Sequence, residues 1–464
     1  MDQAVQWIDE NQSKASLDRL SGRLSFLKFL RRYPVFLLAF GPPLFRSASI
    51  DATAGKIDLW SVLQVGLVSL IGFRAIYRLA SSESIRIPKK IRSVLKFIFF
   101  LGVLFLLSAT YSPSRLVSIA YSGLYLLTFA CVVEFIADVY IAPPNWLQCL
   151  FHLRFIALLL IALDFVVLPF KPGLILSFEE GSGLHFSGGT IGPVTVLCPL
   201  IAIISAYVFL HSLEPKVRSI FFFLVGIAGV LSAQARGCEL ALLFSLSILA
   251  LEWARTSKRS AYILISGFMA FILFFAAATG SIGGGRIWST FNRGESAQGI
   301  ATASGRTVMW HFAIQYCLKH PQGMGYVVGF RMLFKTYHAV GLTLDPSHIG
   351  NAHNCYVQVL ADAGWLALAV YLIMLIKIIY VGWRFAKTPT QETPASCRVP
   401  LHVLRCTIVM LIYLLAGGLT SADGVVPLRT PFYWQNILIA VILGISANMI
   451  MAARAHVTES AERY

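Results

Sequence analysis

The chain of 464 residues is built mostly from apolar side chains. Hydrophobic residues make up 57% of it and charged residues 13%, and its mean hydropathy is +0.72. Soluble domains carry roughly 25% charged residues, so this composition excludes an ordinary water-soluble protein and predicts an all-α polytopic membrane protein. The net charge of +16 comes largely from basic residues that flank the apolar runs, so it does not indicate nucleic acid as a partner.

The first 32 residues precede the apolar runs. Leu17, Leu20, Leu24 and Leu27 recur at helical spacing with basic residues between them, which predicts an amphipathic helix on the membrane surface. Residues 1–14 are polar and lack the apolar core of a cleaved signal peptide.

Apolar runs long enough to cross a membrane follow along the chain. A transmembrane helix needs about 20 mostly apolar residues, and twelve runs come close to that length. They cover residues 33–49, 58–73, 94–110, 116–137, 150–170, 191–211, 219–235, 238–253, 261–279, 357–381, 402–420 and 432–452. The first contains Gly41-Pro42-Pro43 and the two beside Arg236 are short, so these three fit the pattern least well.

The runs divide the chain into five regions. These are an N-terminal segment (1–32), a membrane region of about nine helices (33–279), a polar loop (280–355), three further helices (356–453) and a tail (454–464). Basic residues in short loops mark the cytoplasmic side. They cluster in 74–92, 216–218, 255–259 and 384–398 and in the tail, which predicts that both termini are cytoplasmic and that the polar loop lies outside.

The polar loop is expected to contain two helices. Ser304 is a plausible N-cap for a helix that reaches His320, before Pro321. Its packed face would be Met309, Phe312, Ala313, Tyr316 and Cys317. Glycines at 323, 325 and 329 allow a tight loop after it. A short helix from about Asn351 would end at Gly364, where glycine permits a break before the next span.

Three residues on the predicted outer side could carry chemistry. They are Arg236, Arg306 and His353. Each has an ordinary explanation: a hairpin turn in which Arg236 pairs with Glu239 or a lipid phosphate, a solvated first helical turn for Arg306, and a structural histidine beside Asn354.

Together, the three residues suit metal-free glycosyl transfer from a lipid diphosphate. An imidazole, with an unperturbed pKa of about 6.5, can take the proton of an acceptor hydroxyl. Guanidinium groups can hold the departing diphosphate with bidentate hydrogen bonds. The outer side has no Asp-x-Asp pair or acidic cluster that would hold Mg²⁺, so we expect no metal and no cofactor.

The order and spacing of these residues resemble the bacterial O-antigen ligase and O-antigen polymerase family of membrane glycosyltransferases. The matching elements are Ala235-Arg236-Gly237, Ser304-Gly305-Arg306 with Trp310, Pro321 with Gly323 and Gly325, His353-Asn354-Cys355-Tyr356, and Ala363-Gly364. One departure is Ala235, where family members often have serine.

The resemblance implies about twelve helices in the bacterial inner membrane, with a periplasmic loop over a lateral, lipid-accessible cavity. It also implies inverting, metal-independent transfer of a glycan from undecaprenyl diphosphate to an acceptor sugar. Arg236 and Arg306 would bind the diphosphate and His353 would activate the acceptor, with Asn354 and Trp310 as further substrate contacts. The acceptor would be a lipid A core for a ligase, or a lipid-linked repeat unit for a polymerase, and membrane lipids would surround the bundle.

Several alternatives stay open at this stage. A twelve-span transporter or flippase would have the same composition, and so would a scaffold protein of the cell envelope. Asp164 could be functional or could pair with Arg154, and Glu134 and Asp138 are further intramembrane acids. The outer-loop residues Glu179, Glu180 and His185 could line an acceptor entrance or be solvated. The eight cysteines lack a C-x-x-C motif and are expected to be free thiols, with a Cys317–Cys355 disulfide as the alternative.

Overall fold

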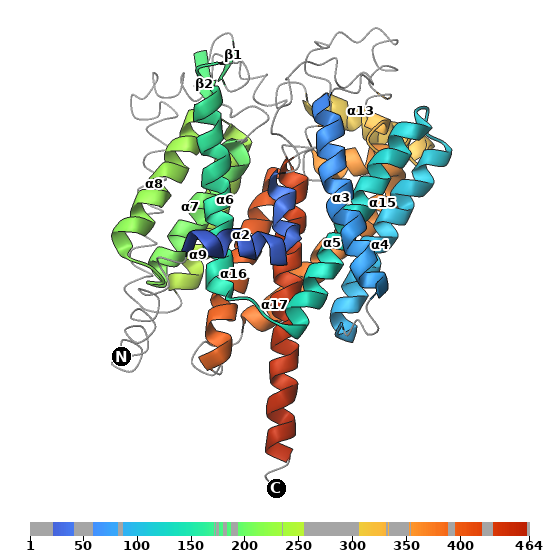
Figure 1. Cartoon of the computed structure of the whole chain (residues 1–464). Coiled ribbons are helices and arrows are strands. Elements are labelled where there is room, and N and C mark those ends of the chain that lie inside the picture. The colour runs from blue at the N-terminus through green and yellow to red at the C-terminus, as the bar shows by residue number, and fades with distance from the viewer. Residues whose placement is uncertain are drawn as a thin grey trace.

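The computed structural model is a helical bundle with one short β-hairpin among its described residues (Figure 1). It describes residues 22–40, 59–81, 87–170, 172, 176–179, 183–186, 194–233, 235–254, 306–330, 333, 352, 354–387, 395–419 and 430–461. The elements are α2 (Gly22–Arg32), η1 (Pro34–Phe40), α3 (Leu59–Ser81), α4 (Lys89–Leu107), η3 (Ser108–Thr110), α5 (Arg115–Ile141), α6 (Trp146–Val167), β1 (Leu176–Glu179), β2 (Gly183–Phe186), α7 (Val194–Leu210), α8 (Lys216–Ala233), α9 (Arg236–Ala254), α13 (Arg306–Lys319), α15 (Cys355–Ala386), α16 (Ala395–Gly417) and α17 (Thr430–Ala461).

The fold class predicted from composition is confirmed. Among the described residues, eight helices are long and apolar enough to cross a membrane, namely α4, α5, α6, α8, α9, α15, α16 and α17. The shorter apolar helix α7 joins them, and α3 covers the run predicted at 58–73. The run at 261–279 lies outside the described residues, so the total of twelve spans stays a prediction.

The run predicted as the first span differs from the expectation. Its described part, Pro34–Phe40, is the 3₁₀ helix η1 and not the start of an α-helix. Gly41-Pro42-Pro43 follows, and each proline disfavours the helical conformation at the residue before it. The local sequence therefore disfavours a continuous α-helix from Pro34 through Pro43.

Consecutive helices run in alternating directions, so their ends gather at two levels. In Figure 1 the helix α13 and the β-hairpin lie at one end of the bundle, here called the upper end, and the C-terminal part of α17 extends from the other, lower end. The described basic residues that predicted the cytoplasmic side, such as Arg78, Lys89, Lys216 and Arg384, belong to helix termini at the lower end. The membrane orientation itself stays a prediction.

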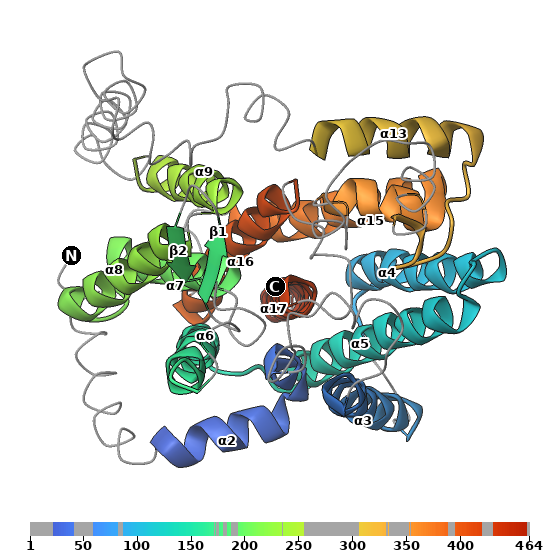
Figure 2. The same ribbon diagram turned by 90° about the horizontal axis from the view of Figure 1, so that it is seen from above.

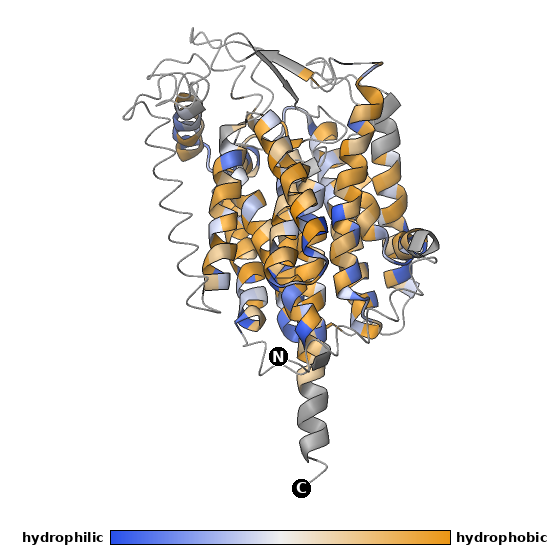
Figure 3. Cartoon of the chain, turned by 90° about the vertical axis from the view of Figure 1, so that its left-hand side faces the viewer, coloured by the Kyte–Doolittle hydropathy of each residue, from blue (hydrophilic) through white to orange (hydrophobic). Residues whose placement is uncertain are grey.

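The helix α17 forms the centre of the bundle (Figure 2), where α5, α15 and α16 pack against it. Phe432, Tyr433 and Trp434 at its upper end are at most 2% exposed. By contrast, α8 exposes Phe221 and Leu224 on the outside. Apolar residues cover most of the helical surface in Figure 3, as expected for helices surrounded by lipid.

The helix α2 is the described part of the predicted amphipathic segment and lies across the bundle (Figure 1). Leu27, the described part of the predicted leucine stripe, is 67% exposed and does not pack on the bundle, so its contact with the membrane surface stays a prediction. Phe26 and Phe29 instead pack against the ring of His152 in α6, with ring centroids 5.2 and 4.5 Å apart. Aromatic contact with the bundle, which spacing alone cannot reveal, decides which side of α2 faces inward.

Ion pairs hold the lower end together and account for most of the intramembrane acids. Arg78 in α3 binds Glu134 and Asp138 in α5 at 2.7 and 2.8 Å. Arg154 in α6 binds both carboxylate oxygens of Glu214, which lies between α7 and α8, at 2.5 and 2.7 Å. The pairing of Arg154 with Asp164, considered from the sequence, is therefore replaced by a pairing with Glu214. Asp164 itself is fully buried in α6.

The remaining sequence alternatives concern cysteines and outer-loop acids. All eight cysteines are free, so the Cys317–Cys355 disulfide is absent. Glu179 and His185 belong to the antiparallel hairpin of β1 and β2, in which Glu179 pairs with Gly183 and Ser177 pairs with His185. Glu180 lies outside the described residues. An acceptor entrance formed by these residues stays a prediction.

Candidate functional site

The helix α13 lies across the upper end, where the sequence predicted a loop helix. Met309, Ala313 and Cys317 are buried at intervals of four residues, and Phe312 and Tyr316 are partly buried, which confirms the predicted packed face. This face packs on Phe330, Leu333, Ala352, Val357 and Ala361 in a small apolar core separate from the main one. Arg306 is the first residue of α13, and its side chain lies outside the described part of the structure.

The helix α15 begins with a short segment, as predicted. Asn354 is its N-cap: the side-chain carbonyl accepts hydrogen bonds from the backbone N–H groups of Tyr356 and Val357, at 3.0 and 3.1 Å. The amide group of Asn354 donates to the carbonyl oxygen of Leu419 at 3.2 Å. Both the oxygen and the nitrogen of this side chain are thus used in hydrogen bonds within the protein. The expected contact of Asn354 with substrate stays a prediction.

A break at Gly364 separates the short segment from the span. Gly364 has φ +81° and ψ −175°, a conformation open essentially to glycine alone. A Cβ at this position would overlap the carbonyl oxygen of Pro321 and lie 2.6 Å from the carbonyl carbon of Gln322. The break predicted at Gly364 is therefore confirmed, and close contact with the loop after α13 explains why glycine is needed.

That loop, residues 320–330, docks on the short segment through backbone hydrogen bonds. Met324 N–H donates to Ala361 O at 3.0 Å, Gly325 N–H to Asp362 O at 2.7 Å and Trp365 N–H to Pro321 O at 3.0 Å. Gly323 and Gly325 have φ values of +77° and +111°, which supports the predicted tight glycine loop.

The loop is also anchored to the upper ends of α4 and α5. Tyr326 is fully buried and stacks on Phe105 with ring centroids 3.8 Å apart. Its N–H donates to the hydroxyl oxygen of Ser108, and its carbonyl oxygen accepts from the hydroxyl of Ser118, at 2.8 and 3.1 Å. The loop is thus attached to the bundle on one side and to α15 on the other.

Ala352, the residue before His353, is held at both of its backbone polar groups. Its carbonyl oxygen accepts from the indole N–H of Trp310 at 2.7 Å, and its N–H donates to Oε1 of Gln358 at 3.0 Å. Trp310 lies one helical turn after Arg306. His353 lies outside the described residues, but both of its chain neighbours are fixed, and one of them is bonded to the helix that Arg306 opens.

Arg236 opens the helix α9 after a short turn from α8, which supports the predicted hairpin turn; its side chain lies outside the described part of the structure. Two residues further on, the Cys238 thiol contacts the hydroxyl of Tyr413 in α16 at 2.8 Å and the carbonyl oxygen of Thr195 in α7 at 2.8 Å. Tyr413 also donates to Thr195. The first turn of α9 is therefore fixed to the upper part of α16.

The same part of α16 contacts the residues that follow His353. Cys355 N–H donates to Gly418 O at 2.8 Å, and the hydroxyl of Tyr356 donates to Leu415 O at 3.0 Å. Tyr413 and Gly418 are separated by about 7 Å along a helix axis, at 1.5 Å per residue. The end of α16 thus joins Cys238, two residues after Arg236, to Cys355, two residues after His353.

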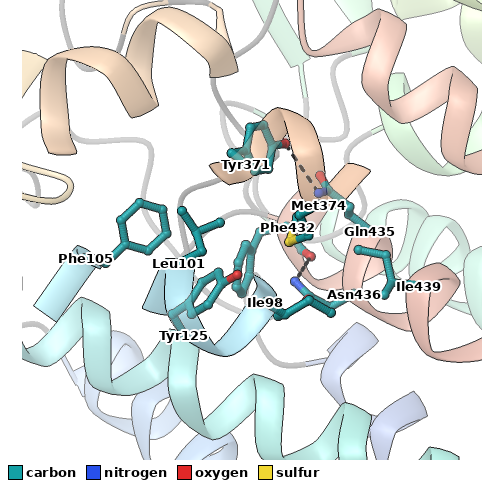
Figure 4. Close-up of a pocket in the computed structure, with 10 residues that line it drawn as sticks. All are labelled: Ile98, Leu101, Phe105, Tyr125, Tyr371, Met374, Phe432, Gln435, Asn436 and Ile439. Carbon is teal, nitrogen blue, oxygen red and sulfur yellow. Dashed lines mark hydrogen bonds between the residues drawn. The ribbon is translucent and has the colours of Figure 1, made fainter. Parts of the chain in front are cut away.

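A small cavity of about 10 Å³, with room for about one water molecule, lies between α4, α5, α15 and α17 (Figure 4). Its lining is apolar apart from Tyr125, Tyr371, Gln435 and Asn436. Two wall residues connect it to the site: Tyr371, whose ring lies 6.1 Å from that of Tyr356, and Phe105, which stacks on Tyr326. The cavity is far smaller than a ligand pocket.

Residues 220–372 match the family model described as O-antigen ligase. Over these residues the chain is similar to the O-antigen ligase family. The matched segment begins in α8 and ends in α15, so it includes Arg236, Arg306, Trp310, His353 and Asn354. The family supports glycosyl transfer of the ligase or polymerase type in general, with lipid-linked glycans and their acceptors as substrates. No curated protein matches the chain.

Sequence reasoning missed two polar residues of this O-antigen ligase segment, Gln358 and Asp362. Both are buried in the short segment of α15, at 2% and 0% exposure, and they are hydrogen-bonded to each other. The available signal was a pair of polar residues four positions apart within the otherwise apolar run Val357–Ala363.

The charge of Asp362 also affects its surroundings. Burial and then the charge of Asp362 raise the pKa of the Cys317 thiol to about 12, and the same two causes raise the pKa of the Tyr111 hydroxyl to about 12. Both groups are therefore neutral at physiological pH. Among the described residues no group of His, Cys, Asp and Glu could hold a metal ion, and the absence of a metal from the reaction stays a prediction.

Proposed function

We propose that the protein transfers a glycan from undecaprenyl diphosphate to an acceptor sugar at the periplasmic face of the inner membrane, with inversion at the anomeric carbon. Arg236 and Arg306 hold the diphosphate, and His353 takes the proton of the acceptor hydroxyl. The acceptor oxygen attacks the anomeric carbon, the bond from that carbon to the diphosphate breaks, and undecaprenyl diphosphate leaves. Both termini are cytoplasmic in this proposal.

One observation supports this proposal above the others. Hydrogen bonds link the three helix starts near the candidate residues: Trp310 of α13 reaches Ala352, and the end of α16 reaches both Cys238 and Cys355. Segments more than 100 residues apart in the chain thereby meet at one end of the bundle. A scaffold role would give no reason for two arginines and a histidine to open or precede helices at the same place.

The helix starts favour an anionic substrate by themselves. Unpaired N–H groups and the helix dipole make an N-terminus attractive to a phosphate. The helices α9 and α13 begin with Arg236 and Arg306, so each start combines the dipole with a permanent positive charge. Two such starts suit the two phosphates of a lipid diphosphate, whose charge increases as the glycan leaves.

The sugars of the substrates would lie above the loop, where Trp310 could stack on a ring.

The proposal is tested with Arg306→Lys and His353→Ala, each assayed for transfer from the lipid-linked glycan pool extracted from a strain that lacks the protein. Loss of the general base is expected to reduce the rate by about 10²–10⁴-fold. Loss of the guanidinium geometry is expected to cost about 10²–10³-fold. His311→Ala is the matched control, because His311 is exposed on α13. Normal transfer by both site variants would refute the proposal.

Polysaccharide from a strain that lacks the protein would separate the two forms of the activity. Polymer that is still made but no longer attached to the lipid A core indicates a ligase. Accumulation of single repeat units indicates a polymerase. Transport of the lipid-linked glycan by purified protein in liposomes, without a covalent product, would favour a flippase instead.

A further inference from the structure

The peptide groups on either side of Ala352 are held by side chains from two different helices. Trp310 of α13 binds the carbonyl oxygen and Gln358 of α15 binds the N–H, while Ala352 itself is fully buried. Buried backbone polar groups outside regular structure need partners, and here side chains supply both. Two side-chain partners on one residue fix the orientation of the chain there, immediately before His353.

The side-chain amide of Gln358 can accept the hydrogen bond from Ala352 N–H in only one orientation. Its Nε2 donates to both oxygens of Asp362, at 3.0 and 2.9 Å, so its Oε1 is left to accept from Ala352 N–H at 3.0 Å. An ionised carboxylate accepts hydrogen bonds and donates none, so a flipped amide would place two acceptors against each other. Asp362 therefore determines which end of Gln358 faces Ala352.

Asp362 is in turn oriented by the loop after α13. Its Oδ2 accepts from Val327 N–H at 2.9 Å and its Oδ1 from Phe330 N–H at 3.1 Å. Val327 has φ +66°, which is unfavourable for a β-branched residue and needs surrounding contacts to persist. Hydrogen bonds to a charged acceptor are roughly twice as strong as neutral ones, so the carboxylate helps to hold this turn.

We infer that Gln358 and Asp362 are positioning residues for His353, acting through the backbone of Ala352. They form a relay from the 327–330 turn to the peptide that precedes the histidine. On the other side of His353, Asn354 is fixed as the N-cap of α15. Both chain neighbours of His353 are thus held by hydrogen bonds. This inference rests on the proposed function.

The polarity of the relay argues that it does more than fill space. A buried carboxylate with a buried amide costs more to desolvate than two apolar residues of the same volume. The neighbouring core of Met309, Ala313, Val357 and Ala361 shows that apolar packing is available at this place. What the polar pair adds is a directed hydrogen bond that holds Ala352, the residue before His353.

The first test is Gln358→Met, which keeps the volume and removes the side-chain hydrogen bonds to Ala352 and to Asp362. The purified full chain in nanodiscs is assayed with the lipid-linked glycan pool from a strain that lacks the protein. We expect kcat to fall by about 10–100-fold, because misplacing a reacting group by about 1 Å can cost 10²-fold. KM for the donor should change by less than about 3-fold, since the groups proposed to bind the diphosphate are untouched.

Asn448→Leu is the matched control. Asn448 also makes a side-chain hydrogen bond inside the bundle, to Val139 O at 2.9 Å, but in the lower part of α17. A purely structural effect would lower the melting temperature and the amount of active protein in both variants without changing kcat per folded molecule. Should Gln358→Met retain kcat within about 2-fold of the natural protein, or raise KM as much as it lowers kcat, the positioning role is wrong.

Gln358→Glu gives a second, pH-dependent test. Its carboxyl can still accept from Ala352 N–H, but it can donate to Asp362 only when the pair holds a proton. We expect the activity relative to the natural protein to rise as the pH falls. A ratio that stays constant with pH would contradict the relay. Should neither variant at 358 fold, Trp310→Phe removes the other bond to Ala352, and an unchanged kcat there overturns the inference.

Binding of undecaprenyl diphosphate alone separates this inference from the proposed function. Gln358→Met should bind it as the natural protein does, whereas Arg306→Ala should bind it at least about 10-fold more weakly, since it loses a charged donor. If Arg306→Ala binds normally and His353→Ala is active, the proposed function fails. If those two variants behave as expected but Gln358→Met keeps its kcat, the positioning role alone fails.

Discussion

Replacing Gly364 by alanine should detach the loop 320–330 from α15. The new Cβ would overlap the carbonyl oxygen of Pro321, which is backbone and cannot rotate away, and would lie 2.8 Å from the Cα of Gln322. The backbone at this position, φ +81° and ψ −175°, is also unfavourable for any residue with a side chain. Either the segment before Gly364 or the loop must move.

The cost of this substitution can be worked out from the contacts. Forcing alanine into this conformation costs about 1–3 kcal/mol. Moving the loop away breaks two hydrogen bonds near the clash, from Trp365 N–H to Pro321 O and from Met324 N–H to Ala361 O, each worth about 1 kcal/mol. The sum, about 3–5 kcal/mol, would shift the docking equilibrium by at least about 100-fold, at about 1.4 kcal/mol per tenfold.

We therefore expect Gly364→Ala to insert into the membrane but to lose most transfer activity and to melt at a lower temperature. The measurements are thermal unfolding of the protein in nanodiscs, limited proteolysis between α13 and α15, and transfer from the lipid-linked glycan pool. Gly123→Ala is the control, since a Cβ there meets nothing within 4 Å. Equal stability and activity of the two variants would show that the loop is not docked as described.

Three further predictions concern single side chains. Glu214→Leu leaves Arg154 buried without its bidentate partner and should destabilise the protein by about 3–5 kcal/mol, whereas Arg154→Leu with Glu214→Leu should be close to neutral in thermal unfolding. Burial opposes the charge of Glu214, but Arg154 outweighs it and lowers the pKa of Glu214 below 4.5. The stability that the ionised Glu214 contributes should thus be fully present above about pH 4.5 and be lost only as the pH falls through its lower, folded-state pKa. A melting temperature that drops between pH 7 and 5 in the natural protein but not in Glu214→Gln would contradict this. Cys317, with a pKa of about 12, should have a thiolate fraction below about one in ten thousand at pH 7.5 and should resist maleimide until the protein unfolds, while the half-buried Cys397 reacts in the folded state.

The features that the sequence predicts well depend on local periodicity and on backbone chemistry. The packed face of α13 follows from apolar residues repeated every three or four positions, and the structure buries Met309, Ala313 and Cys317 as expected. The break at Gly364 follows from the conformations that glycine alone adopts. Both properties are encoded within one or two helical turns, so a single sequence suffices to predict them.

Properties that depend on a distant partner were beyond such reasoning. Arg154 has Asp164 on its own helix, yet it pairs with Glu214, 60 residues away, which is brought close by the packing of α6 against α7. Likewise the leucine spacing of the N-terminal segment indicates an apolar face, but it gives no sign that Phe26 and Phe29 pack on the ring of His152. Spacing indicates that a face is apolar, but not which neighbour will cover it.

The helix α16 shows most clearly that sequence reasoning does not reveal distant packing partners. The candidate residues lie in the matched segment 220–372, whereas α16, whose upper end contacts Cys238 and leads to the contact with Cys355, lies outside it. Three contacts with the start of α15 are made by carbonyl oxygens of α16 and the two residues after it, those of Leu415, Gly418 and Leu419. Every residue type has a carbonyl oxygen, so these contacts constrain where α16 lies and place few demands on its sequence. Sequence motifs can therefore predict which side chains act while giving no sign of the helix that brings them together.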